Sequence, residues 1–564
     1  MKTPFRILVA AAAISMICSP ALPQAQYSSH DALMKRAEQL AKANPSVCNV
    51  KSLIKTSGNK DILVITIGSG DTENKPAVAV FGGVDGSYIL SREIAMGFAE
   101  RIVKESSGEE IKTLLGKVTF YVFPDVSPDA SAQFFAKLKY ERNINARDID
   151  DDRDFKTNED PAEDLNNDGY ITQIRIADPT GTYIESADDK RVMVLADLSK
   201  GEKGAFLVYS EGTDNDKDGK FNEDGDGGVN FNRNLTFNYE EFGANAGLHP
   251  VSEPETKAVL DFLFGHFNIF ATISFGPQDN LCQGGGERGR GGSAQQASQA
   301  GQGREAGMDN SQGDMPRMRD RRITSVMKTD ETVLKYVSEK YREITGAKGS
   351  PVSKTDPGNF MDWSYYHYGR YSFSTPAWWF TADKEKTGDA AFLKYADDKK
   401  LGDVFVPWTT INHPDFPGKK VEVGGIKPFA EIVPPATWID SLVNTNSKFI
   451  ETVASLHPEL EFVDIKTEAK GDNVYRVSLK IHNKGVFATT SEAGDMNQFT
   501  RRMRLTLEPA AKQKFLSGQK VQQVQRIEGG KALEFSWLIM GQGTVKITAG
   551  AVNTGFISTS ADLK

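Results

Sequence analysis

The chain has 564 residues, of which 39% are hydrophobic and 25% are charged. This balance is typical of a globular protein and excludes a fully disordered chain. The formal net charge of -9 argues against binding to nucleic acid or to an anionic membrane surface, because both need a basic face. Seven histidines and three cysteines are too few for an array of zinc fingers.

The first 25 residues have the three parts of an export signal. Lys2 and Arg6 form a basic start, residues 7–16 are apolar, and small residues follow at positions 19–21. The apolar run, at about ten residues, is too short to span a membrane. We therefore expect residues 1–25 to be a cleaved signal peptide and the protein to be secreted or periplasmic. No later segment is long and apolar enough to predict a membrane span.

Residues 26–457 are predicted to form one large α/β domain. Four apolar runs have the length of buried strands, at residues 61–67, 77–81, 117–123 and 270–275. Residues 91–103 carry apolar side chains four apart, which is typical of a helix face. Strand, glycine-rich turn, helix and strand in this order predict a sheet with crossover helices. A helical segment at residues 437–456 closes the domain.

Composition then separates an insert and a tail from this domain. Residues 282–322 contain no Val, Ile, Leu, Phe, Tyr or Trp, so this segment cannot bury enough apolar surface to offset its ordering entropy, and we expect a disordered insert. Residues 458–564 hold four segments in which apolar and polar residues alternate. This period of two predicts a small C-terminal all-β sandwich.

Acidic stretches with the spacing of calcium-binding loops occur within residues 148–172 and 211–228. Alternate oxygen-bearing side chains in a tight loop converge on one hard cation. The candidate ligands are Asp150, Asp152, Asp154, Asp164, Asn166, Asp168, Asp214, Asp216 and Asp218. No copy has a Glu at position 12, so none is an EF-hand. We expect structural Ca²⁺; the alternative is a set of solvated acidic loops.

Four motifs resemble those of the zinc carboxypeptidases. Residues 228–234, GVNFNRN, resemble the family's DLNRNF motif, and residues 252–256, SEPET, match its SEPET helix start. Residues 124–129 are similar to its NPDG segment and residues 362–365 to its DW-x-Y segment. The motifs occur in family order. The resemblance implies an α/β fold with a mixed central sheet and helices on both faces.

The resemblance also implies a mechanism. In that family a Zn²⁺ ion is held by the His and Glu of an HxxE turn and by a distant His, and it activates a water molecule. A Glu near the end of the domain is the general base. An Asn-Arg pair, which corresponds to Asn232 and Arg233 here, binds the C-terminal carboxylate of the peptide. The alternative is that Arg233 has a structural role.

The zinc-site positions depart from the family pattern. Asp85 stands at the His of the HxxE turn, Tyr88 at its Glu, Gly276 at the third ligand and Pro376 at the general base. None of the seven histidines has a Glu three residues on. Zinc is expected from the family, but these residues do not rebuild a three-ligand site, so we expect neither zinc nor catalysis.

Three functions remain open. The first is a catalytically inactive homologue that binds a peptide or peptidoglycan-stem carboxylate, or a protein partner, without cleaving it. The second is an active metallocarboxypeptidase with a rearranged site, in which Asp85 would act with His249 or His367. The third is a calcium-stabilised interaction protein that binds through its sandwich. Zinc content separates the first two, and replacement of Arg233 separates the first from the third.

Overall fold

The computed structural model describes most of the chain outside its first 25 residues. The described residues are 26–149, 156–158, 160–215, 217, 225, 227–282, 323–354, 356–381 and 388–564. The predicted signal peptide and residues 283–322 of the predicted insert lie outside them. So do five calcium candidates: Asp150, Asp152, Asp154, Asp216 and Asp218.

A six-stranded mixed sheet forms the centre of the large domain, in the order β1-β2-β4-β3-β9-β10. β1 and β2 pair antiparallel and β2 is antiparallel to β4, whereas β4, β3, β9 and β10 run parallel. The strands are β1 (Cys48–Lys55), β2 (Asp61–Ile67), β3 (Ala77–Phe81), β4 (Thr119–Phe123), β9 (Ile269–Phe275) and β10 (Tyr371–Thr375). The predicted mixed sheet is confirmed.

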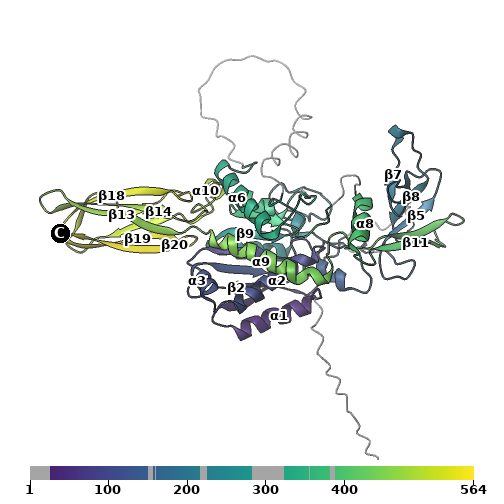
Figure 1. The fold of residues 1–564 in the computed structure, drawn as a ribbon, viewed down its shortest axis with the longest axis horizontal. Helices are drawn as coiled ribbons and strands as arrows, with labels where there is room; N and C mark the ends of the chain where they lie inside the picture. The colour runs from purple at the N-terminus through teal and green to yellow at the C-terminus, as the bar shows by residue number, and fades with distance from the viewer. Residues whose placement is uncertain are drawn as a thin grey trace, which may run out of the picture.

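Helices cover both faces of this sheet because its central strands are apolar on both sides. Alternate residues of β3 show the division: Val78 and Val80 belong to one hydrophobic core, whereas Ala79 and Phe81 belong to another. The first core is completed by α1 (His30–Ala43), α2 (Ile89–Lys104), α3 (Glu109–Lys117), α6 (Lys328–Thr345) and α9 (Ile439–Ser455). The second is completed by α5 (Pro254–Gly265) and α7 (Phe360–Tyr366). Figure 1 shows α1, α2 and α9 together on one side of the sheet.

A second six-stranded sheet, all antiparallel, was not predicted from the sequence. Its order is β11-β12-β5-β8-β6-β7, and it joins two segments that lie far apart in the chain. The strands are β5 (Gln173–Ala177), β6 (Tyr183–Glu185), β7 (Met193–Leu195), β8 (Phe206–Ser210), β11 (Phe405–Ile411) and β12 (Val421–Ile426). Arg175 crosses it through an ion pair with Glu422 at 2.9 Å. This sheet, with α8 (Gly388–Lys399) beside it, extends from the large domain at the end opposite the C-terminus (Figure 1).

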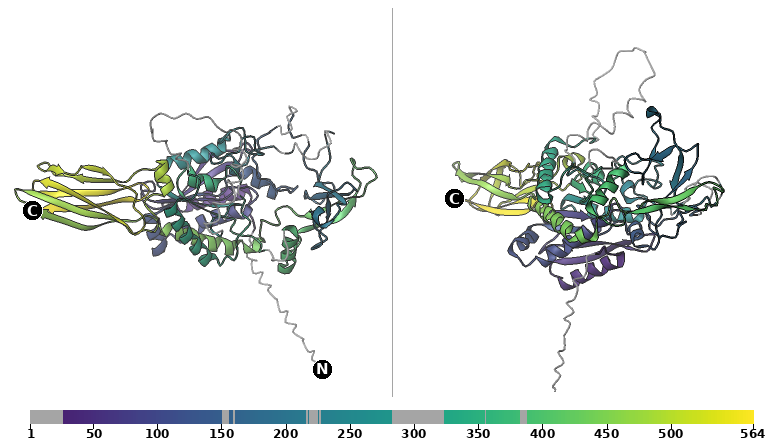
Figure 2. Two further views of the ribbon diagram at one scale, coloured as in Figure 1. Left: turned by 90° about the horizontal axis from the view of Figure 1, so that it is seen from above. Right: turned by 45° about the vertical axis from the view of Figure 1, so that its right-hand side comes forward.

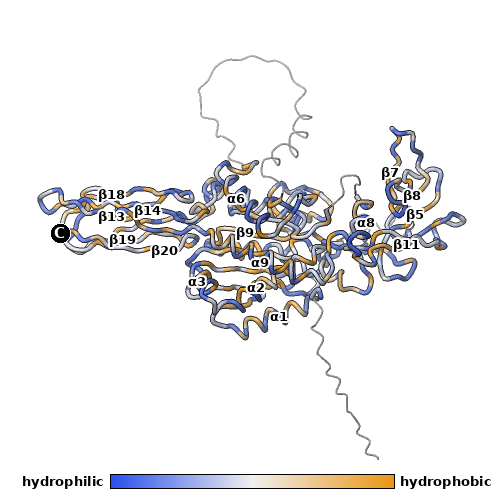
Figure 3. Tube along the Cα trace, in the orientation of Figure 1, coloured by the Kyte–Doolittle hydropathy of each residue, from blue (hydrophilic) through white to orange (hydrophobic). Residues whose placement is uncertain are grey.

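The C-terminal residues form the predicted β-sandwich. One sheet has the order β13-β14-β18-β16 and the other β17-β15-β19-β20. The strands are β13 (Leu460–Ala469), β14 (Val474–Asn483), β15 (Arg504–Glu508), β16 (Lys514–Ser517), β17 (Val521–Gln523), β18 (Ala532–Met540), β19 (Gly543–Ala551) and β20 (Gly555–Leu563). Hydrophobic and hydrophilic residues alternate along these strands (Figure 3), and the inward set packs around Trp537.

Hydrogen bonds join the sandwich to the large domain. Asp330 of α6 is buried and accepts from the backbone N–H groups of Glu492 at 2.9 Å and Ala493 at 3.2 Å, at the start of α10 (Glu492–Asn497). It also accepts from the Tyr365 hydroxyl at 2.9 Å. A buried carboxylate needs such donors to offset its desolvation. The sandwich is therefore held at one end of an elongated molecule (Figure 2).

Two further features are the lengths of the helices and the state of the cysteines. In the part of the chain that the structure describes, no helix has both the length and the apolar character needed to cross a membrane. Cys48 and Cys282 are both buried and free.

Candidate functional site

The carboxyl ends of four parallel strands define the candidate site. Phe81 at the end of β3 pairs with Phe123 of β4 and with Ser274 of β9, and Thr375 of β10 pairs with Phe275. Loops that follow parallel strands meet at one edge of a sheet, where α/β proteins bind their ligands. Asp85 and Tyr88 follow β3, Gly276 follows β9 and Pro376 follows β10. The structure therefore brings these four positions to one edge.

Asp85 is the buried acid of this edge, with 5% of its surface exposed. Its Oδ1 accepts from the Ser87 backbone N–H at 3.0 Å and from the Ser87 hydroxyl at 2.6 Å. Its Oδ2 accepts no hydrogen bond from any described residue. Burial raises the pKa of Asp85, and Glu141 acts in the same direction, whereas the Ser87 donors and Lys354 lower it. Burial and the charge of Asp85 also raise the pKa of the Tyr88 hydroxyl, which is therefore neutral.

The positions after β9 and β10 carry no side chain that can bind a metal or accept a proton. A Cβ atom added to Gly276 would lie 2.5 Å from Cγ2 of Val84, so the Val84 side chain fills the space next to this glycine. The Gly276 N–H donates to the carbonyl of Thr375 at 3.1 Å. Pro376 has no titratable group.

The residues at these positions do not fit a zinc ion. Structural and catalytic zinc sites need three or four His, Cys or carboxylate ligands, and of the three ligand positions only Asp85 offers one. Among the described residues, no group of three or more His, Cys, Asp or Glu side chains is placed to hold a metal. His249 and His367 are exposed, and their Nδ1 atoms pair with the Pro250 carbonyl and the Thr236 hydroxyl.

Asn232 and Arg233 lie in a short 3₁₀ helix, Phe231–Arg233. Asn232 is 2% exposed; its Nδ2 donates to Oε1 of Gln278 at 2.7 Å, and its Oδ1 accepts from the Phe360 N–H at 2.8 Å. Asn232 therefore ties the loop after β9 to the start of α7. Nη2 of Arg233 pairs with Glu240 at 2.8 Å. Sequence reasoning missed Gln278, for which no motif gave a signal.

Two nitrogen donors of this group are enclosed without an acceptor. They are Nε2 of Gln278, whose residue is 1% exposed, and Nε of Arg233, and neither has a hydrogen-bond partner among the described residues. A buried donor left unpaired costs about 1–3 kcal/mol. The Asn232–Gln278–Arg233 group, which we call the donor group, is therefore suited to a ligand that brings acceptor oxygens.

A second set of side chains, which sequence reasoning also missed, brings negative charge to the same region. Oε1 of Glu141 accepts from the Phe429 N–H at 2.8 Å, so Glu141 lies beside the segment that follows β12. The pKa of Glu431, two residues on, is raised to about 7 by burial first and then by Asp389 and Glu141, against Lys354. The backbone N–H of Lys354 donates to the carbonyl of Pro277 at 3.2 Å, next to Gly276. We call Asp85, Glu141 and Glu431 the acid group.

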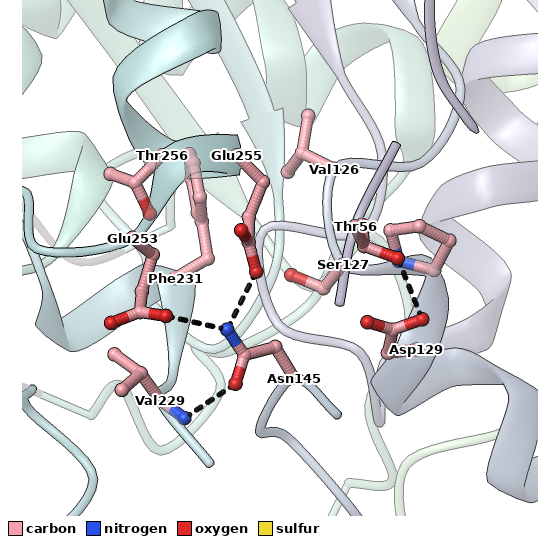
Figure 4. A pocket seen from close by; sticks show the side chains of 11 residues that line it. Thr56, Val126, Ser127, Asp129, Asn145, Val229, Phe231, Glu253, Glu255 and Thr256 are labelled. Carbon is pink, nitrogen blue, oxygen red and sulfur yellow. Dashed lines mark hydrogen bonds between the residues drawn. The ribbon is translucent and has the colours of Figure 1, made fainter. Parts of the chain in front are cut away.

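A small enclosed cavity of about 10 Å³ lies beside the SEPET segment (Figure 4). Nδ2 of Asn145 donates to Glu253 at 3.0 Å and to Glu255 at 2.6 Å, and Arg147 pairs with Glu253 at 2.8 Å. The Thr256 hydroxyl lines the cavity and has no partner among the described residues. The volume is about that of one water probe. The two glutamates of this motif therefore anchor the loop that carries Asn145 and Arg147.

The structure brings the acidic stretches of residues 148–172 and 211–228 together. The Asn215 N–H donates to Oδ1 of Asp160 at 3.0 Å, and the Leu165 N–H donates to the buried Glu211 at 2.8 Å. Of the predicted calcium ligands, Asp164 accepts from the Asp168 and Gly169 N–H groups at 3.1 and 2.8 Å. Asn166 and Asp168 lie in the same turn, and Asp214 lies next to Asn215, in the other stretch.

Comparison with known proteins places this fold in a family. The model of the family described as zinc carboxypeptidase matches residues 33–378, which is more than half of the chain. The chain therefore belongs to the zinc carboxypeptidase family. Residues 459–562, the sandwich, match a Domain of unknown function (DUF8731). A search of curated proteins finds no match.

Solved structures of carboxypeptidases are similar to this chain in fold. Carboxypeptidase A from Helicoverpa armigera is 12% identical, covers 76% of this chain and 73% of its own, and has a TM-score of 0.40. Bovine thrombin-activatable fibrinolysis inhibitor, in complex with tick carboxypeptidase inhibitor, is 13% identical, with 76% and 97% covered and a TM-score of 0.39. A metallo-carboxypeptidase from Burkholderia cenocepacia is 10% identical, with 76% and 70% covered and a TM-score of 0.33.

Proposed function

We propose that this zinc carboxypeptidase family member does not cleave peptides and instead binds the C-terminal carboxylate of a peptide. The observation that carries the proposal is the set of residues at the carboxyl edge of the sheet: Asp85, Tyr88, Gly276 and Pro376. Peptide hydrolysis needs an activated water, a polarised carbonyl and a general base. One buried carboxylate and a neutral tyrosine do not make a metal site. Pro376, at the position of the general base, cannot accept a proton.

The donor group supports binding of a carboxylate. Arg233 offers a planar fork that matches a carboxylate, and the enclosed Nε2 of Gln278 and Nε of Arg233 lack acceptors in the described part of the chain. The pair of Arg233 with Glu240 does not prevent this, because Glu240 is half exposed and exposed ion pairs contribute at most about 1 kcal/mol. A ligand carboxylate can therefore displace Glu240.

The family and the predicted export signal define the class of ligand. A secreted or periplasmic protein meets peptides, peptidoglycan stem peptides and the C-termini of other proteins, all of which end in a carboxylate. Structural Ca²⁺ in the acidic stretches is part of the proposal, because oxygen-rich loops that contact each other are suited to a hard cation.

Metal analysis and a binding assay test this proposal together. The mature protein is dialysed against Zn²⁺ and Ca²⁺, and its metal content is measured by mass spectrometry. We expect Ca²⁺ without stoichiometric Zn²⁺, and no release of the C-terminal residue from a peptide panel. One tightly held zinc per chain, or cleavage, would support the active enzyme with a rearranged site instead.

Two matched variants test the carboxylate site by calorimetry with peptides and their C-terminal amides. Arg233→Ala removes a charged donor, which is worth about 1.5–3 kcal/mol, so affinity should fall about 10- to 100-fold. Glu240→Gln removes the competing carboxylate and should raise affinity. Amides that bind as well as free acids would refute the site, and partner binding unaffected by Arg233→Ala would favour an interaction protein that uses its sandwich.

A further inference from the structure

The donor group and the acid group lie on neighbouring loops. Gly276 and Val84 are in contact, since a Cβ atom on Gly276 would lie 2.5 Å from Cγ2 of Val84. Asp85 is the next residue after Val84, and Gln278 lies two residues after Gly276 on a loop that leaves the adjacent parallel strand. Gln278 is in turn bonded to Asn232 at 2.7 Å. A ligand that reaches both loops therefore meets hydrogen-bond donors on one and a carboxylate on the other.

The acid group lacks enough cationic partners of its own. Glu141, Asp356 and Asp389 add negative charge around Asp85, Tyr88 or Glu431, and Lys354 opposes it at Asp85 and Glu431. Lys354 makes no ion pair with Asp85 or Glu431 within 4.0 Å in the described part of the chain. The Oδ2 atom of the buried Asp85 is therefore open to a further donor.

The unpaired polar atoms of the two groups are of two chemical types. Nε2 of Gln278 and Nε of Arg233 are enclosed donors without an acceptor among the described residues, whereas Oδ2 of Asp85 is an acceptor that receives no hydrogen bond from a described residue. A metal ion would satisfy the second type only, and no described group of three ligands is placed to hold one. A peptide carboxylate alone would satisfy the first type only.

We propose that the ligand is a free α-amino acid, whose carboxylate binds the donor group and whose ammonium binds Asp85. An α-amino acid carries both charges on one carbon, so a small ligand of this class can address two neighbouring loops. Glu141 and Glu431 add negative potential around the ammonium. This inference rests on the proposed carboxylate site and adds a preference for a free amino group, so the site would bind single amino acids more tightly than peptide chain ends.

Calorimetry on the full mature protein tests the inference with free L- and D-amino acids and their N-acetyl derivatives. The probes are leucine, alanine and lysine, each with its N-acetyl and its amide form. We expect the free amino acids to bind at least about tenfold more tightly than either derivative, because each derivative loses one charged hydrogen-bonding group.

Three variants separate the two ends of the ligand. Asp85→Asn keeps the Oδ1 acceptor for Ser87 and removes the charge, so it should weaken the free amino acid about tenfold or more and leave the N-acetyl form within about twofold. Glu431→Gln should act in the same direction more weakly, since it lies outside the Ser87 turn. Arg233→Lys keeps the charge but not the fork and should weaken both forms.

Each outcome decides between the two proposals. N-acetyl amino acids or peptides that bind as well as free amino acids would overturn the inference and leave the carboxylate site standing. So would unchanged binding of free amino acids by Asp85→Asn with a native melting curve. Binding that appears only when Zn²⁺ is added would overturn the inference in favour of a metal. No binding of any carboxylate at millimolar concentration would overturn both.

Discussion

Glu431 gives the sharpest test of the electrostatics in the acid group. Burial, Asp389 and Glu141 raise its pKa from an ordinary value of 4.5 to about 7, against Lys354. The folded protein therefore holds the proton that the unfolded chain releases between these two pH values. Folding stability should fall as pH rises from about 4.5 to about 7 and then level off, because a folded-state pKa above the unfolded one favours the protonated state.

The magnitude follows from the size of the shift. One pKa unit corresponds to about 1.4 kcal/mol, so Glu431 costs the folded protein about 3 kcal/mol above pH 7. Replacement by Gln, which stays neutral, should recover most of this energy at pH 8 and none at pH 4.5. A domain of roughly 400 residues has an unfolding entropy of about 0.8 kcal/mol/K, so the gain at pH 8 is about 4 °C in Tm.

Thermal unfolding of the wild type and Glu431→Gln, followed by circular dichroism from pH 4.5 to 8.5, measures this difference. Glu339→Gln, on an exposed position of α6, is the matched control and should shift no melting curve. The reasoning is refuted if the difference in Tm between Glu431→Gln and the wild type is the same at both ends of the pH range.

Three further predictions concern other parts of the molecule. His457 is buried, and burial lowers its pKa to about 4. Because the unfolded chain takes up the proton first, the free energy of unfolding should fall by up to about 3 kcal/mol as pH drops from 6.5 to 4. Denaturant titrations of His457→Gln should show a free energy of unfolding that depends less on pH over this range. Chelation of Ca²⁺ should lower the Tm of the large domain and open residues 148–172 and 211–228 to limited proteolysis, whereas an unchanged cleavage pattern would count against calcium there. If an ammonium group binds beside Glu431, calorimetric affinity for a free amino acid should rise between pH 6 and 8, and an affinity independent of pH would contradict that placement.

The central sheet and the sandwich could be predicted because the burial of their strands determines a pattern of apolar residues in the sequence. β3 and β9 are buried on both faces, so they appear as continuous apolar runs. β14 alternates between Tyr475, Val477, Leu479 and Ile481 inside and polar residues outside. In both cases the pattern is local, and a single segment is enough to show it.

The second sheet could not be predicted in this way. β6 and β7 have three residues each and are half exposed, so neither shows a repeating pattern of apolar and polar residues. β12 pairs with β5, although more than two hundred residues separate them in the chain. The same long-range arrangement places Glu431 near Glu141, so no sequence motif could predict the acid group. Gln278 was missed for a related reason, since its role depends on its contact with Asn232.

The proposed ligand follows from the charges of the acid group. A zinc ion placed among Asp85, Glu141 and Glu431 would compensate their charge, and each carboxylate would then favour the ionised state. With Gly276 packed against Val84 and Tyr88 neutral, no three-ligand site exists among the described residues. Burial, together with the charges of Asp389 and Glu141, raises the pKa of Glu431 to about 7. A bound ammonium group would add one positive charge without needing the geometry of a metal site, so the proposed site favours a ligand that carries its own cation.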